Sequence, residues 1–214
     1  MTRSGLLTTV FRHFRSERMR LFERTFPITN STRILDVGGS SSIWQFAETR
    51  PRLTILNFPS ALESSVKSVD CVAGDGCMLP FKDNAFDIVF SNSVIEHVGL
   101  RDAQEQFANE VARVGQSYWI QTPNRKFPVE QHVMLPFIHY LPMAWQRLII
   151  ERFTLWQLIV KPSPAQRAFY LDHYLNQMRL LDKSELQALF PGAAVISEKT
   201  LGLAKSLIAI RTAK

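Results

Sequence analysis

The sequence predicts an α/β fold, in which a doubly wound sheet of seven strands carries a helical cap between its fifth and sixth strands. Three observations predict this fold. Short apolar runs alternate with helical patterns as far as residue 124, which is typical of a parallel sheet with helices on both faces. The alternation then stops over a stretch rich in aromatic residues, proline and histidine. Two further apolar runs close the chain.

Each expected element of the first half follows from a local pattern. An amphipathic helix is expected over residues 5–25 and ends at Pro27, because apolar residues recur there at helical spacing. Apolar runs bounded by turn-forming residues predict strands at 33–37, 53–58, 68–73, 86–91 and 117–121. Helices are expected between them at 43–49 and 101–114. Right-handed crossovers through such helices make neighbouring strands parallel.

The second half divides into a cap and a closing unit. The cap, residues 125–181, contains two helical patches, at 143–159 and 164–180. A final helix is expected over 183–190, with Asp182 or Ser184 as its N-cap, followed by strands at 193–199 and 206–211. The expected organisation is one domain over 1–214, with an N-terminal helix at 1–26, a sheet-forming half at 27–124, the cap, and a final helix and strand pair at 182–214.

Composition limits the class of protein. Hydrophobic residues make up 46% of 214 residues, which is enough for one domain with a sizeable core. No apolar run approaches the roughly 18 residues of a membrane-spanning helix, and no secretory signal is evident, so a cytoplasmic protein is expected. Cys71 and Cys77 lack zinc-ligand spacing. We therefore expect no bound metal, and a disulfide is not favoured.

The net charge of +6 is concentrated near the N-terminus. Residues 1–24 contain six arginines and two glutamates, a net charge of +4. Such a run usually forms a solvated helix face. The alternatives are an anionic partner or substrate, or a weak peripheral contact with a membrane surface.

The first strand runs directly into Asp36-Val37-Gly38-Gly39-Ser40. Gly38 and Gly39 let the backbone turn tightly and approach a ligand, because neither carries a Cβ atom. Asp36 can accept hydrogen bonds from loop amides or, through water, from a ligand ammonium group. The alternative is a strand–turn–helix connection that binds no ligand.

Two later blocks favour a nucleotide-type ligand at this edge of the sheet. Gly74-Asp75-Gly76-Cys77 follows the third strand, and Ser91-Asn92-Ser93-Val94-Ile95-Glu96-His97-Val98 closes the fourth. The order and spacing of the three blocks resemble those of class I S-adenosylmethionine-dependent methyltransferases of the type 11 group. The resemblance implies S-adenosyl-L-methionine as cofactor and a Rossmann-like sheet with an antiparallel last strand. Residues 27–124 are then the cofactor-binding half.

The resemblance also implies cofactor-binding residues, and these are Asp36, Gly38, Gly39, Ser40, Asn57, Phe58, Asp75, Gly76, Cys77, Ser91 and Asn92. Among them Asp75 would bind the adenine amino group, and Asn57 would bind a ribose hydroxyl. The chain departs from the family pattern at Ser40 and Ser42, where glycines are usual, and at Asn57, where an acid is usual. For Asn57 the alternative is a residue that only caps a turn.

The acceptor side is expected after the fourth and fifth strands, because loops at the carboxyl ends of parallel strands carry the reacting groups. Catalytic roles are expected for Glu130 and His132, as a base and its orienting partner, or for His97 at the mouth of the site. Arg125, Lys126, His139 and Tyr140 are candidate substrate-binding residues. For each of these residues the alternative is a structural role in an ordered loop or in the core of the cap.

These patterns indicate an enzyme that transfers a methyl group from S-adenosylmethionine to O, N or C of a small-molecule acceptor. One alternative is methylation of an amphiphilic lipid or saccharide acceptor at a membrane. Another is a non-catalytic scaffold that binds the cofactor, which the serines and Asn57 favour. Nucleic acid is a weaker candidate partner, because no recognised RNA-binding module accompanies the basic residues. A dehydrogenase is disfavoured by the glycine pattern.

Overall fold

The computed structural model describes residues 3–59, 69–152, 163 and 171–213. Its central element is a seven-stranded sheet with the order β3-β2-β1-β4-β5-β9-β8. The strands are β1 (Arg33–Val37), β2 (Arg52–Asn57), β3 (Asp70–Ala73), β4 (Phe86–Asn92), β5 (Gly115–Pro123), β8 (Ala194–Thr200) and β9 (Leu203–Arg211). Strands β1 to β5 are parallel, whereas β9 is antiparallel to both β5 and β8. The predicted seven strands and antiparallel last strand are confirmed.

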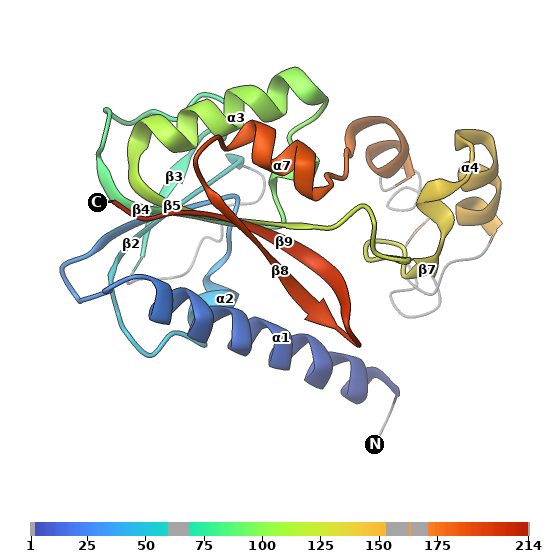
Figure 1. Cartoon of the computed structure of the whole chain (residues 1–214), viewed down its shortest axis with the longest axis horizontal. Coiled ribbons are helices and arrows are strands. Elements are labelled where there is room, and N and C mark those ends of the chain that lie inside the picture. Colours follow the sequence, from blue (N-terminus) through green and yellow to red (C-terminus); the bar gives the residue numbers. More distant parts are fainter. Residues whose placement is uncertain (1–2, 60–68, 153–162, 164–170, 214) are drawn as a thin grey trace.

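Helices cover both faces of the sheet (Figure 1). Helices α1 (Arg3–Thr25) and α2 (Ser41–Trp44) lie on one face, and α3 (Arg101–Val114) and α7 (Lys183–Leu189) lie on the other. Strand β4 supplies both cores, because Phe90 packs with Phe22 of α1 while the neighbouring Val89 packs with Phe107 of α3. Burial on both faces explains why the central strands are nearly continuous apolar runs.

Helix α2 is shorter than predicted, because it ends at Trp44 rather than continuing to residue 49. The backbone amides of Glu48 and Thr49 donate to the carboxylate of Glu23 on α1, at 3.1 and 2.8 Å. The Arg50 guanidinium donates to the carbonyls of Trp44 and Ala47, at 3.2 and 2.9 Å. These side-chain partners satisfy the groups that further helical turns would otherwise have paired.

The N-cap of α7 is Asp182 rather than Ser184. Its carboxylate accepts the amides of Ser184 and Glu185, and the Glu185 carboxylate accepts the amide of Asp182 at 2.9 Å. This reciprocal pair is a capping box.

The cap begins with a hairpin that the sequence patterns did not predict. It pairs β6 (Val129–Glu130) with β7 (Leu135–Pro136) and leads through a 3-10 turn at Ile138–Tyr140 into α4 (Met143–Arg152). A π-helical turn occupies His173–Gln177, and residues 178–180 are not helical. The rest of the two predicted helical patches, 153–159 and 164–170, lies outside the described residues. The cap has a core of its own, formed by Val133, Ile138, Ile150, Tyr174 and Leu175.

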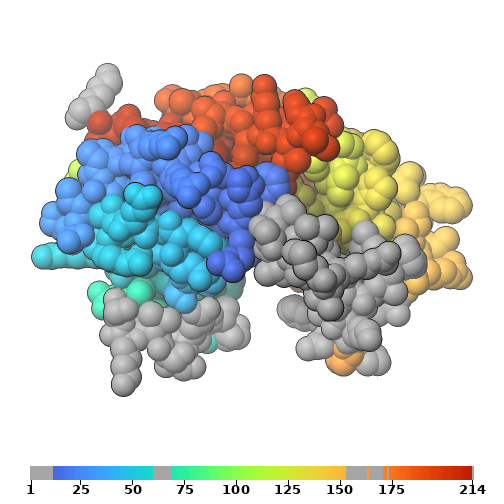
Figure 2. All heavy atoms as spheres, turned by 90° about the horizontal axis from the view of Figure 1, so that it is seen from below, coloured from blue at the N-terminus to red at the C-terminus, as the bar shows by residue number. Residues whose placement is uncertain are grey.

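The cap residues shown in yellow in Figure 2 lie at one end of the molecule, and the blue N-terminal residues lie beside the red C-terminal residues. None of the helices in the described part of the chain is long and apolar enough to cross a membrane. Cys71 and Cys77 are both free thiols.

Candidate functional site

Two adjoining pockets open at the carboxyl edge of the parallel strands. The first, here called the β3-side pocket, has a volume of about 510 Å³, and its walls include Asn57, Phe58, Asp75, Gly76 and His97. The second, the α1-side pocket, has a volume of about 400 Å³ and lies between α1 and the loop after β1. Gly38, Asn57 and Ser93 line both pockets. Together they offer one extended site of the size that a cofactor needs.

Two polar side chains mark the β3-side pocket. Asp75 follows β3 and is exposed, and its Oδ1 accepts the Cys77 amide at 2.8 Å, which forms a tight turn. Asn57 ends β2, where its Nδ2 donates to the Gly39 carbonyl at 3.2 Å and its Oδ1 accepts the Phe58 amide at 2.9 Å. Asn57 therefore caps the strand end, and it also holds the glycine loop against the pocket.

The glycine loop after β1 requires its glycines. Gly38 has φ +72, and a Cβ atom there would lie 2.7 Å from both γ carbons of Val94. A Cβ atom on Gly39 would lie 1.9 Å from Oδ2 of Asp36. Side chains at these positions would collide with the walls of the site. Ser40 is tolerated because it is extended, and its Oγ lies 2.7 Å from Oγ of Ser42.

Asp36 lies at the base of this loop and is 0% exposed. Trp44 Nε1 donates to its Oδ2 at 2.7 Å, whereas Oδ1 has no hydrogen-bond partner within the described part of the chain. Burial raises the pKa of Asp36 to about 7, although the Trp44 hydrogen bond opposes the shift. A buried carboxylate without a cationic neighbour is costly, so the arrangement suits a ligand that brings a positive charge.

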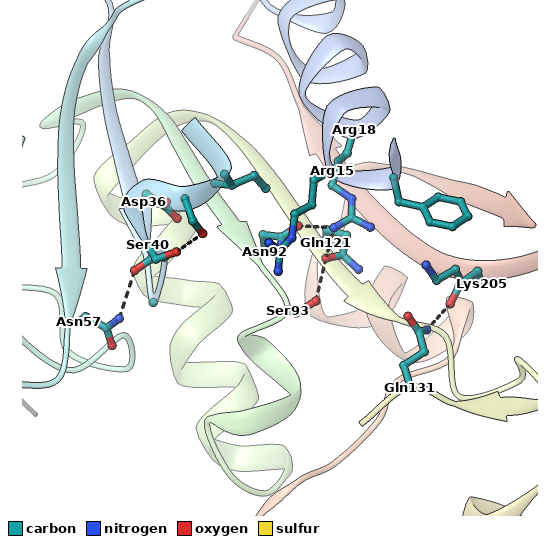
Figure 3. A pocket seen from close by; sticks show the side chains of 15 residues that line it. Arg15, Arg18, Asp36, Ser40, Asn57, Asn92, Ser93, Gln121, Gln131 and Lys205 are labelled. Atoms are coloured by element: carbon teal, nitrogen blue, oxygen red, sulfur yellow. Dashed lines mark hydrogen bonds between the residues drawn. The ribbon is translucent and has the colours of Figure 1, made fainter. Parts of the chain in front are cut away.

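The α1-side pocket has basic walls (Figure 3). Its lining includes Arg15, Arg18 and Lys205. The Arg18 guanidinium pairs with Glu198 at 2.6 Å and also donates to the side-chain oxygens of Asn92 and Gln121. Arg18 is only 7% exposed, so the expectation of a solvated arginine face is wrong at this position. The chain folds this way because α1 packs across the ends of β4 and β5, which supply the polar partners.

Three candidate catalytic residues meet beside the β3-side pocket. Glu130 of β6 accepts the amides of His132 and Val133 through Oε2, and its Oε1 lies 2.7 Å from His132 Nδ1. His132 Nε2 in turn lies 3.1 Å from Nε2 of His97, which ends the 3-10 turn after β4. The order is therefore carboxylate, imidazole, imidazole, and His97 forms part of the pocket wall.

A fourth polar residue, Glu96, completes this cluster. It is 0% exposed, Thr122 Oγ1 donates to its Oε2 at 2.9 Å, and burial raises its pKa to about 7. Burial alone would lower the pKa of His132, but the hydrogen bond to Glu130 and the charges of Glu130 and Glu96 outweigh it and raise that pKa. The sequence patterns assigned Glu96 no role, although it adjoins His97 in the block that carries the resemblance.

Comparisons with known proteins agree with this geometry. A family model described as a methyltransferase domain matches residues 51–117. The structure is similar to a putative methyltransferase of Haloferax volcanii, solved in complex with the Trm112 activator, at 14% identity and a TM-score of 0.58, covering 96% of this chain and 91% of that one. It is also similar to a SAM-dependent methyltransferase from Aquifex aeolicus, at 10% identity and a TM-score of 0.50, covering 90% and 87%. The chain therefore has the fold of these methyltransferases, and its residues 51–117 match a methyltransferase domain.

A curated relative, an uncharacterized protein of Mycobacterium tuberculosis, is 39% identical over 54 residues. The match covers 25% of this chain and 18% of the length of that relative. It identifies a shared segment and assigns no substrate.

S-adenosylmethionine is the cofactor of class I methyltransferases, and the residues of the two pockets fit it. The β3-side pocket offers a carboxylate and an amide, which can accept from the amino and hydroxyl groups of a nucleoside. The α1-side pocket offers the unpaired oxygen of Asp36 for an ammonium group, and Arg15 and Lys205 for a carboxylate. The methionine part of S-adenosylmethionine carries both an ammonium group and a carboxylate.

Most of the predicted cofactor residues line one of the pockets, namely Asp36, Gly38, Gly39, Ser40, Asn57, Phe58, Asp75, Gly76 and Asn92. Ser91 and Cys77 do not. The Ser91 hydroxyl is buried and donates to the Val37 carbonyl at 3.0 Å, so it joins β4 to β1. The Cys77 thiol faces the carbonyl of Ala103 on α3 at 3.3 Å.

The four candidate substrate-binding residues line neither pocket. Arg125 pairs with Asp182 and Glu185 of α7, and Lys126 lies 3.4 Å from Asp182. His139 Nε2 and the Tyr140 hydroxyl lie 2.8 and 3.2 Å from the carbonyl of Arg125. The contacts tie the cap to α7, and a role in substrate binding stays a prediction.

Proposed function

We propose that this protein transfers a methyl group from S-adenosylmethionine to a small-molecule acceptor. The observation that carries the proposal is one extended site in which Asp36, Asn57 and Asp75 lie at three neighbouring strand ends, with His97 in its wall. A sulfonium donor leaves as a neutral thioether, so the protein needs mainly to align the acceptor and exclude water.

The histidine pair favours a hydroxyl acceptor. Such an acceptor must lose a proton, and an imidazole held by a carboxylate can receive it. Glu130 fixes the orientation of His132, and His132 meets the ring of His97 at 3.1 Å. His97 is the member of this series that reaches the pocket.

A second candidate is methylation of an amphiphilic acceptor at a membrane. Four large apolar or aromatic side chains of the cap are more than half exposed, namely Phe137 (60%), Tyr140 (54%), Met143 (55%) and Trp145 (58%). Apolar side chains gathered on one subdomain favour contact with lipid or with a partner.

Transfer of labelled methyl from S-adenosylmethionine separates these functions. One set of reactions offers water-soluble phenols, hydroxy acids and sugars, and the other offers lipids with the same hydroxyl groups in vesicles. We expect label in a soluble acceptor, and we expect His97→Ala to lower the rate by about 100-fold or more, as for a general base. The matched control is His13→Ala, on the exposed side of α1, which should leave the rate unchanged.

Label found only in the vesicle lipids would favour the second candidate. Cofactor binding without transfer to either set would favour a scaffold.

A further inference from the structure

Three potential metal-binding atoms converge beside the β3-side pocket. Glu96, His97 and His132 each offer one ligand atom, and these three atoms lie within 4.8 Å of one another. They come from two segments, the turn after β4 and the β6–β7 hairpin, which lie 35 positions apart. We propose that these three residues bind one divalent first-row transition-metal ion such as Zn²⁺.

The spacing of the three atoms suits such an ion. With metal–ligand bonds of roughly 2.0–2.1 Å, neighbouring ligands in a tetrahedral zinc site lie about 3.3 Å apart. Here the two imidazole nitrogens are 3.1 Å apart, and His97 Nε2 is 3.9 Å from Glu96 Oε1. These separations are close to the spacing that one such ion requires.

The unpaired oxygen of Glu96 is an independent observation that points to a ligand. The side chain is 0% exposed, and Oε1 has no hydrogen-bond partner among the described residues. Buried carboxylate oxygens are nearly always hydrogen-bonded, because an unpaired one costs free energy. A cation between Glu96 and the histidines would remove this cost.

The surrounding residues hold the three ligands in place. Glu130 Oε1 lies 2.7 Å from His132 Nδ1, an arrangement that directs Nε2 of the same ring toward the centre of the cluster. Thr122 Oγ1 donates to Oε2 of Glu96 and leaves Oε1 for the cation. A ligating histidine supported by a carboxylate is the usual outer shell of a protein zinc site.

The donor set selects the class of ion. Two imidazoles and one carboxylate favour Zn²⁺ or a neighbouring transition metal over Mg²⁺ and Ca²⁺, which prefer oxygen ligands. Three protein ligands leave an open position, as in catalytic zinc sites. The side chains of His97 and His132 are 29% and 19% exposed whereas Glu96 is buried, so the open position faces the pocket side.

A role for the metal ion in methyl transfer rests on the proposed function. In the loaded protein the two histidines would act as ligands rather than as a base. An acceptor hydroxyl bound at the open position would be oriented and acidified by the ion, and its proton would pass to solvent. The spacing of the cysteines predicted no bound metal, whereas the proposed site uses one glutamate and two histidines as ligands.

The test is a titration of the metal-free full chain with Zn²⁺ by calorimetry, and with Co²⁺ by visible absorption. We expect one ion per chain and the absorption of low-coordinate Co²⁺ without a thiolate charge-transfer band. His132→Ala and His97→Ala should each weaken Zn²⁺ binding by more than about 100-fold, and Glu130→Gln by about 10- to 100-fold. His13→Ala is the matched control and should bind Zn²⁺ as the unmodified protein does.

Failure to bind Zn²⁺ or Co²⁺ overturns the proposal, and so does full-strength binding by His97→Ala. Circular dichroism of each metal-free variant shows whether it is folded. If an alanine variant is unfolded, Glu96→Gln replaces it in the titration. Binding of S-adenosylhomocysteine to the metal-free protein is measured separately. The metal site and the methyltransferase function can therefore fail independently.

Discussion

Asp36→Asn is expected to make the ligand-free protein more stable than the unmodified protein at pH 8. Burial raises the pKa of Asp36 from 3.8 to about 7, so the folded protein holds a proton that the unfolded chain releases above pH 4. The stability due to that proton is fully present below about pH 4 and is lost as the pH rises to about 7. Asparagine is neutral at every pH and can still accept from Trp44.

We expect Asp36→Asn to raise the free energy of unfolding by on the order of 2–4 kcal/mol at pH 8, and by less than half of that at pH 5. Urea denaturation at the two pH values measures both differences. Asp87→Asn is the control with the opposite sign, because its surface pairing with Arg33 lowers the pKa of Asp87. Equal effects of Asp36→Asn at pH 5 and pH 8 would contradict the burial argument.

The same substitution is expected to weaken cofactor binding, because it removes the negative charge that faces the α1-side pocket. Asp36 would then lower the stability of the free protein but strengthen cofactor binding, and such a trade-off is frequent in binding sites.

Arg18→Ala is expected to lower the free energy of unfolding by about 3–5 kcal/mol, as when one partner of a buried ion pair is removed. The change leaves Glu198, whose side chain is 15% exposed, without its cation. It also removes the donor that Asn92 and Gln121 share. Urea denaturation at pH 7 measures the loss.

Arg15→Ala is the matched control, because Arg15 belongs to the same helix but is exposed, and the change should alter stability by less than about 0.5 kcal/mol. Replacing both Arg18 and Glu198 by methionine should recover most of the lost stability. Similar losses from Arg15→Ala and Arg18→Ala would show that the helix as a whole, rather than this pair, is responsible.

The sheet could be predicted because its signals are local. Each strand is a short apolar run closed by turn-forming residues, and Asp36, Asn57 and Asp75 stand at strand ends, which parallel strands place at one edge. Where tertiary contacts determine the end of an element, local sequence patterns do not predict it. Helix α2 ends at Trp44, and the amides of Glu48 and Thr49 bind Glu23, which lies more than twenty positions upstream.

The contacts among the candidate catalytic residues could not be predicted from local patterns either. Glu130, His132 and His97 were candidates by position alone, and their contact depends on a hairpin of two-residue strands that is too short to give a periodic signal. The Arg125 partners, Asp182 and Glu185, lie about sixty positions away. The pairing of this charged loop with Asp182 and Glu185 could therefore not be predicted, and its role in substrate binding stays a prediction.

Calorimetric titration with S-adenosylhomocysteine tests the central claim most directly, namely that Asn57 and Asp75 bind the nucleoside part of the cofactor. We expect one site with a dissociation constant on the order of micromolar, weakened by about 10- to 100-fold in Asp75→Ala through loss of a polar partner. Asp70→Ala, at the exposed start of β3, is the matched control and should bind normally. No binding at millimolar ligand, or unchanged binding by Asp75→Ala, would contradict the account.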